Sequence, residues 1–190
     1  MKHESDKIEL IKMGAVAAVC KYGIAGASVS RIASMAGVSD GYLYRHYKSK
    51  EELLYAILDN TLNVVTDKIA DLLGNCSDAR EIADYFLDFL YENSEKDSNM
   101  IKFLIIFQND FTIEVKREFN DRITHLCKEI VALGCSKGVM RSGVSHVELY
   151  LALVTVPLQF LSLKYTGLLY ANEIEYQKIK DYAYNSLFLI

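Results

Sequence analysis

Proline occurs once in this chain of 190 residues, at Pro157, and ten glycines accompany it. Helix breakers are therefore scarce, and 51% of the residues are hydrophobic, which is enough for a substantial buried core. No segment shows the sustained alternation of apolar and polar residues that is typical of a half-buried strand. The sequence predicts an all-α protein.

Apolar residues recur three and four positions apart along most of the chain, as on the buried face of an amphipathic helix. Small polar residues that can cap a helix precede most of these stretches. The expected caps are Ser28, Ser39, Ser49, Ser77, Ser98, Thr112, Ser145 and Asn172. The expected helices cover residues 6–22, 29–36, 40–46, 49–73, 78–94, 98–109, 112–136, 145–169 and 173–189. Gly23 and Gly26 are expected to end the first helix, and Gly37 the second.

Charge is distributed unevenly between the two ends of the chain. Residues 1–50 contain eight Lys/Arg and four Asp/Glu, whereas the remainder contains 13 and 21. A basic N-terminal part suggests an anionic partner for that part alone. We expect a DNA-binding domain in residues 1–48 and a second, larger helical domain in residues 49–190.

A helix-turn-helix pattern lies within residues 29–46. The motif needs a small residue where two helices touch, a glycine in the turn and an apolar anchor, and Ala33, Gly37 and Leu43 occupy these places. With Leu43 inward, its neighbours form the outer face of a short helix that can enter a major groove. The residues expected near bases are Ser30, Asp40, Gly41, Tyr42 and Arg45. Those expected at phosphates are Ser28, Tyr44, His46, Lys48 and Lys50.

Two of these residues have roles that the sequence leaves open. Tyr42 can pack on a thymine methyl group or donate to a base. Asp40 can accept from a cytosine amino group, or simply favour the positive N-terminal end of its helix. The alternative for the whole cluster is that its aromatic and basic side chains only pack and meet solvent. Its place after a Gly-Val-Ser turn and the local positive charge favour DNA.

Residues 23–53 resemble the N-terminal domain of the tetracycline-repressor (TetR) family of bacterial transcriptional regulators. The matching elements are Ile32-Ala33, Ala36-Gly37-Val38-Ser39, Leu43-Tyr44, His46-Tyr47 and Ser49-Lys50-Glu51. The resemblance implies an all-helical dimer in which three helices read DNA and a divergent larger domain binds an effector and dimerises. It implies phosphate contacts for Ser28, Tyr44, His46 and Lys50, and positions near bases for Ser30, Gly41 and Tyr42. The chain departs from the family at Ala27, where threonine is frequent, and at Asp40, where neutral residues are common.

The larger domain is expected to hold any effector. Six of the eight phenylalanines lie between residues 86 and 119. They can form a solid aromatic core, or line a pocket for an apolar or aromatic amphiphile with a few polar groups to orient it. The pocket candidates are Phe86, Phe89, Tyr91, Phe103, Phe107, Gln108, Phe111, His125 and Gln159.

The expected helix at 145–169 is apolar on nearly all sides. Its most apolar stretch, residues 149–163, is shorter than the roughly 20 residues that span a membrane. A helix of this kind can bury one side in its own core and the other against a second subunit. The predicted seam of a homodimer consists of Val154, Leu158, Leu161 and Tyr165, and the last helix would complete a four-helix interface. Such a dimer presents recognition helices to successive major grooves about 34 Å apart.

The remaining chemistry in the sequence is sparse. Cys20, Cys76, Cys127 and Cys135 form no CxxC pair, so we expect free thiols in a reducing cytosol rather than a zinc site. No catalytic constellation or cofactor motif is evident, so neither an enzyme nor a cofactor is expected. Charged residues throughout positions 1–12 are unlike a signal peptide and favour a cytoplasmic protein.

The leading hypothesis is a homodimeric repressor that leaves a pseudo-palindromic operator when a small hydrophobic effector binds. One alternative keeps DNA binding but has a solid core and no effector. Activation in place of repression is also open.

Overall fold

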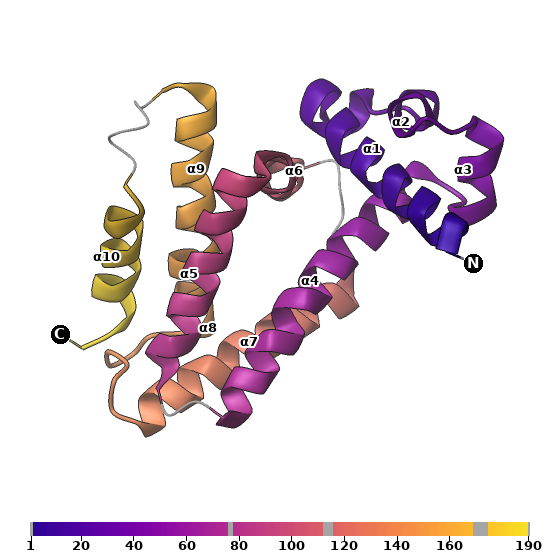
Figure 1. The fold of residues 1–190 in the computed structure, drawn as a ribbon. Helices are drawn as coiled ribbons and strands as arrows, with labels where there is room; N and C mark the ends of the chain where they lie inside the picture. The colour runs from indigo at the N-terminus through magenta and orange to yellow at the C-terminus, as the bar shows by residue number, and fades with distance from the viewer. Residues whose placement is uncertain (1, 76–77, 112–115, 169–174, 190) are drawn as a thin grey trace. The chain divides into compact units, whose positions relative to one another are not determined.

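The computed structural model describes residues 2–75, 78–111, 116–168 and 175–189. Within these ranges the chain forms helices joined by short turns, and the one extended pairing is an isolated bridge between Met140 and Phe188 (Figure 1). The predicted all-α fold is confirmed. The chain divides into two compact units, which we call the head unit (Met1–Leu62 with Asp97–Ile113) and the body unit (Asn63–Lys96 with Glu114–Ile190). The sequence places the boundary between a DNA-binding domain and a larger helical domain at residues 48 and 49, and this functional division stays a prediction.

Five helices contribute to the head unit. They are α1 (Lys2–Gly26), α2 (Val29–Ala36), α3 (Asp40–His46), the first half of α4 (Lys50–Asn75) and α6 (Ser98–Asn109). The regular part of α1 ends at Gly23, whose φ of 70° is open to glycine at no steric cost, as the sequence predicts. Ser49 Oγ accepts from Glu52 N at 3.1 Å at the start of α4, and Glu52 reaches back to the backbone N–H of Lys48 at 2.7 Å.

Tight packing holds α1 against α2 and α6. A Cβ atom at Gly14 would lie 2.8 Å from the backbone nitrogen of Ala36, so only glycine allows these two helices to approach so closely. On another side of α1, the Cys20 thiol donates to the Asn99 carbonyl at 3.2 Å near the start of α6. Fully buried side chains of this unit include Ile11, Ile32, Leu43, Leu53, Leu54, Ile101 and Phe103.

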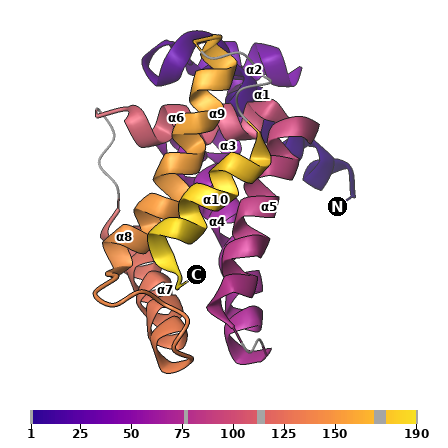
Figure 2. The same ribbon diagram turned by 90° about the vertical axis from the view of Figure 1, so that its left-hand side faces the viewer.

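The body unit contains the second half of α4 and the later helices. They are α5 (Ala79–Lys96), α7 (Arg117–Ser136), α8 (His146–Tyr150), a π-helical turn η1 (Leu151–Thr155), α9 (Val156–Thr166) and α10 (Tyr176–Leu187). Helices α5, α9 and α10 lie side by side (Figure 2). The core joins residues from all of these elements, among them Ile82, Leu87, Ile130, Leu149, Ile179 and Leu187.

One expected helix cap differs from the prediction. Asp97, not Ser98, is the N-cap of α6 and accepts from Asn99 N at 3.1 Å. Ser145 forms the predicted capping box with Glu148. The expected caps Ser77, Thr112 and Asn172 lie outside the described residues, as does Cys76.

A π-helical turn interrupts the long apolar helix that the sequence predicts at 145–169. Pro157 has no N–H to donate to the carbonyl four residues before it, and its ring crowds that carbonyl. The wider turn at Leu151–Thr155 lies directly before the proline, and it inserts one residue that rotates the side chains beyond it. Simple periodicity therefore misplaces the faces of α9.

The rotation corrects the predicted dimer seam. Leu158 and Leu161 are 4% and 2% exposed, because the core of a single chain already buries them. Val154 is half-buried and packs against the same core, and the Tyr165 hydroxyl donates to the Ser94 carbonyl at 3.3 Å. The available apolar surface of this helix lies elsewhere, at Val147 and Leu151.

By length and composition alone, one helix among the described residues, His146–Thr166, could cross a membrane. Core helices of soluble proteins pass the same test, and 33% of its most apolar window is buried here. Among its buried residues, Leu149, Ala152 and Leu153 belong to the core of the body unit.

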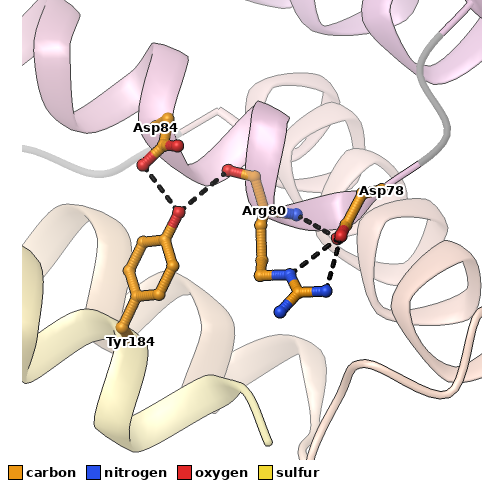
Figure 3. A network of polar contacts seen from close by, with 4 residues as sticks. All are labelled: Asp78, Arg80, Asp84 and Tyr184. Carbon is orange, nitrogen blue, oxygen red and sulfur yellow. Dashed lines mark hydrogen bonds and ion pairs between the residues drawn. The ribbon is translucent and has the colours of Figure 1, made fainter. Parts of the chain in front are cut away.

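A polar network fastens α10 to α5. The Tyr184 hydroxyl donates to Asp84 at 2.6 Å and lies 3.5 Å from the Arg80 carbonyl, while the Arg80 guanidinium pairs with Asp78 at 2.7 Å (Figure 3). Lys180 also pairs with Asp84, at 2.6 Å. Burial, together with the hydrogen bond to Asp84, raises the pKa of Tyr184 above its ordinary value.

Candidate DNA-binding site

Local interactions fix the turn between α2 and α3. Ser28 Oγ accepts from Arg31 N at 3.4 Å at the start of α2, and Gly37 ends that helix with a φ of 67°. Ser39 Oγ then accepts from Tyr42 N at 3.2 Å and begins α3. Leu43 is fully buried and anchors α3 from below. The predicted helix-turn-helix geometry is present.

The face of α3 opposite Leu43 meets solvent. Seven of the ten predicted DNA-contacting residues are exposed, namely Ser28, Ser30, Asp40, Gly41, Tyr44, Arg45 and Lys48. The other three, Tyr42, His46 and Lys50, are half-buried. The structure therefore brings the predicted residues of α3 together on and around one surface, which we call the α3 face.

Cationic side chains surround the ring of Tyr42. The Arg45 guanidinium lies 4.6 Å from the ring centroid and the Lys7 amine 5.2 Å from it. The His46 ring is tilted against it with centroids 4.9 Å apart. Lys7 was not among the predicted residues, because it lies on α1, far from Tyr42 in the sequence. Contacts of this kind hold Tyr42 in one orientation and place positive charge beside it.

Ser30 and Asp40, which are both predicted to lie near bases, are hydrogen-bonded to each other. The Ser30 hydroxyl on α2 donates to Asp40 Oδ2 on α3 at 2.5 Å. Neither side chain is therefore independent of the other.

Lys50 has an intramolecular partner that the sequence did not indicate. Its amine donates to the Ile24 carbonyl at 2.9 Å and lies 4.0 Å from a carboxylate oxygen of Glu51. This contact ties the start of α4 to the end of α1. The phosphate contact predicted for Lys50 stays a prediction, and it would use the ammonium hydrogens that Ile24 leaves.

The predicted effector residues are divided between the two units. Phe103, Phe107, Gln108 and Phe111 belong to the head unit, and the remaining five belong to the body unit. Phe103 and Phe107 are buried, with ring centroids 6.1 Å apart, and Tyr55 packs edge-on against Phe107. Phe111 is 98% exposed, so the structure places it on the surface and not in a pocket.

Within the body unit, His125 also lies on the surface. Its side chain is 72% exposed and its Nε2 is 3.6 Å from Glu129. Arg122, also on α7, is half-buried and donates to Asn63 Oδ1 at 2.6 Å. Helical spacing placed His125 beside apolar residues but did not determine which side of that stripe it occupies. Gln159 is half-buried.

Two hollows differ in size and place. Phe86 and Phe89 pack against the body core, and Tyr91 stacks on Tyr176 with centroids 4.7 Å apart. Beside that pair lies a void of about 10 Å³, lined by Leu87, Leu90, Tyr91, Pro157, Leu161, Tyr176 and Ile179. An open groove of about 270 Å³ lies in the head unit among Met13, Val16, Ile57, Met100 and polar neighbours.

The described residues contain no group of His, Cys, Asp and Glu that could hold a metal ion.

Sequence comparisons cover the N-terminal part of the chain. Residues 14–57 match the family model described as bacterial regulatory proteins, tetR family. The uncharacterized HTH-type transcriptional regulator YvdT of Bacillus subtilis is 30% identical over 100 residues. That alignment covers 53% of this chain and 52% of YvdT, so the chain spans about half the length of this curated relative.

Structural comparisons cover nearly the whole chain. A TetR family transcription regulator from Marinobacter aquaeolei VT8 has a TM-score of 0.78 at 20% identity, over 99% of both chains. FadR from Bacillus subtilis, solved in complex with stearoyl-CoA, has a TM-score of 0.75 at 16% identity, over 94% of this chain and 98% of FadR. At these identities the likeness establishes the fold. With the family match over the helix-turn-helix, it confirms the expected resemblance to the tetR family of bacterial regulatory proteins.

Proposed function

We propose that the protein is a DNA-binding transcriptional regulator that binds a pseudo-palindromic operator as a homodimer in the cytoplasm. The observation that carries this proposal is the α3 face. A short helix, anchored by buried Leu43, exposes polar and cationic side chains in the segment that matches the family model. Side chains of this kind meet base edges and phosphates when a recognition helix lies in a major groove.

The positive charge of the α3 face supports phosphate binding. Arg45 and Lys48 are exposed, and Lys7 adds a third cation beside Tyr42. Neutralising phosphates releases counterions, so affinity should fall steeply as salt rises. Tyr44 and the Ser28 hydroxyl can donate to phosphate oxygens at the edges of the face.

The apolar surface of the body unit supports a homodimer. The helix His146–Thr166 buries a third of its most apolar window, and Val147 and Leu151, four residues apart, are exposed on it. Tyr182 of α10 is exposed as well. A second copy of the chain offers the same surface, so a two-fold interface can cover both. We therefore place the seam at Val147, Leu151 and Tyr182, in place of Val154, Leu158, Leu161 and Tyr165.

An effector is the second part of the proposal. The FadR relative of the same fold binds stearoyl-CoA, which favours an acyl or similarly apolar effector. The void beside Tyr91 and Tyr176 has room for about one water molecule, so an effector must open the body unit to enter. Effector binding would then shift the population toward a dimer arrangement that fits the operator poorly. The protein would leave the operator, and repression would end.

The size of that void also supports the alternative of a DNA-binding regulator with a solid core and no effector. Stearoyl-CoA can separate the two. Under the effector proposal it releases the protein from its operator in a concentration-dependent way and raises the unfolding temperature.

The experiment that tests DNA binding is selection of bound duplexes from a random pool by the full-length protein. We expect a motif with two related half-sites. Enrichment of no sequence would contradict the proposal.

A further inference from the structure

The hydrogen bond between Ser30 and Asp40 joins two exposed side chains on different helices. Ser30 Oγ donates to Asp40 Oδ2 at 2.5 Å, from α2 to α3. Both residues are exposed, so burial of a polar group does not require the contact. The cap of α3 does not require it either, because Ser39 accepts from Tyr42 N. The charge of Asp40 also favours the positive N-terminal end of α3, but that effect does not require the bond from Ser30.

A carboxylate on this face works against general DNA affinity. Phosphates repel Asp40, and its negative charge opposes Arg45, Lys48 and Lys7 in their attraction to the duplex. A group that weakens binding to every duplex can still increase sequence specificity, because it weakens binding to some bases more than to others.

The chemistry of base edges decides which base that is. In the major groove, cytosine presents only an amino donor, whereas guanine presents two acceptors and thymine one. Adenine presents an amino donor beside an acceptor. The bond from Ser30 occupies Oδ2 and fixes the direction of the carboxylate, and Oδ1 has no hydrogen-bond partner among the described residues. A fixed acceptor fits cytosine best and is repelled by guanine and thymine.

We infer that Ser30 and Asp40 act as one specificity-determining pair, in which Ser30 positions the carboxylate and Asp40 accepts from the amino group of a cytosine in each operator half-site. Ser30 is then a positioning residue and does not itself read a base. This inference rests on the proposed DNA-binding function and names the base chemistry of that same site.

The test is selection from a random duplex pool by the wild-type protein, Asp40→Asn, Ser30→Ala and a matched control, Asp67→Asn. Asp67 is an exposed carboxylate on α4 in the body unit, so its change removes the same charge without altering a residue of the α3 face. Wild type and Asp67→Asn should enrich cytosine at one position of each half-site. Asp40→Asn should enrich adenine there, because asparagine pairs with the donor and acceptor of adenine. All other positions should keep their preference.

Ser30→Ala provides the second measurement. It should keep the cytosine preference while the affinity ratio of cytosine over other bases at that position falls roughly twofold to tenfold, the effect of one lost hydrogen bond. Thermal unfolding of each variant separates specificity from folding. Asp40→Glu, which keeps the carboxylate, should retain cytosine even where Asp40→Asn lowers stability.

The outcomes distinguish this inference from the proposed function. A wild-type motif whose every position is unchanged in Asp40→Asn overturns the inference and leaves DNA binding intact. An unchanged cytosine ratio in Ser30→Ala overturns the pairing. A wild-type protein that enriches no sequence overturns the proposed function itself, before any variant is compared.

Discussion

In the head unit, α3 buries Leu43 and leaves most of its other side chains in solvent, whereas in the body unit α9 buries Pro157, Leu158 and Leu161 and presents few charges. The two helices differ in what a substitution can change. On α3 the residues that would bind a partner are separate from the one that holds the fold. On α9 two of the side chains that hold the fold, Pro157 and Leu161, also line the void of the body unit. Binding and stability should therefore be separable in the head and coupled in the body.

The largest difference in stability is expected between substitutions at two adjacent residues of α3, Leu43 and Tyr44. Leu43→Ala should lower the free energy of unfolding by about 2–5 kcal/mol, because it leaves a cavity under α3. Tyr44→Ala should change that free energy by no more than about 0.5 kcal/mol, since Tyr44 is exposed, and should weaken DNA binding. Chemical denaturation and a duplex-binding assay measure both. Equal destabilisation by the two changes would break the separation.

A smaller effect is expected where α1 meets α2. Gly14→Ala places a methyl group 2.8 Å from the backbone nitrogen of Ala36, so the helices must move apart at a cost of about 1–3 kcal/mol. Gly74→Ala in α4 is the control, because a Cβ there meets no atom within 4 Å. It should stabilise the protein by about 0.4–1 kcal/mol, as measured by denaturation. A neutral Gly14→Ala would show that the approach of the two helices is not tight.

Helix caps differ between the units and give a third test. Ser39→Ala removes the side-chain cap of α3 and should cost about 1 kcal/mol of stability. The N-cap of α10, Glu175, has extended backbone angles and makes no side-chain cap bond. Glu175→Ser should therefore stabilise the protein, by about 0.5 kcal/mol or more. Melting temperatures that move in the same direction for both variants would contradict this contrast.

The smallest expected effect is confined to the body unit and to alkaline pH. Burial, and next the hydrogen bonds to Asp88 and Asp84, raise the pKa of Tyr176 and Tyr184. Above about pH 10 the unfolded chain releases these phenol protons before the folded chain does, so stability falls as pH rises. Below that pH both tyrosines are protonated in the folded and the unfolded chain, so they do not make the stability depend on pH.

The double variant Tyr176→Phe/Tyr184→Phe should reduce this alkaline loss, measured as the slope of unfolding free energy against pH. Part of the slope should remain, because burial also raises the pKa of Tyr150. An unchanged slope in the double variant would contradict the role of the two hydroxyls.

The head unit was the more predictable part of the fold. Ser28, Gly37 and Ser39 act on residues a few positions away, so the sequence was enough to place them. The contacts of Lys7 with Tyr42 and of Lys50 with Ile24 join residues far apart in the chain. Spacing along one helix contains no information about such partners.

In the body unit the sequence identified helices but not their faces. The helix at 146–166 is apolar on nearly every side, so the spacing of its apolar residues does not show which face is buried. The π-helical turn before Pro157 also rotates the faces that follow it. On α7 the same uncertainty placed His125 inside, whereas the structure has it on the surface. The polar network of Tyr184 with Asp84 was likewise invisible, because it depends on how α5 and α10 pack.

The most direct test of the central claim is a titration of the wild-type protein with its selected duplex over a range of salt concentrations. We expect two chains to bind per duplex, with a preference for the selected sequence over a shuffled one and a logarithm of affinity that falls linearly with the logarithm of salt concentration. A protein that binds selected and shuffled duplexes equally at low salt, or that does not bind either, would contradict the central claim.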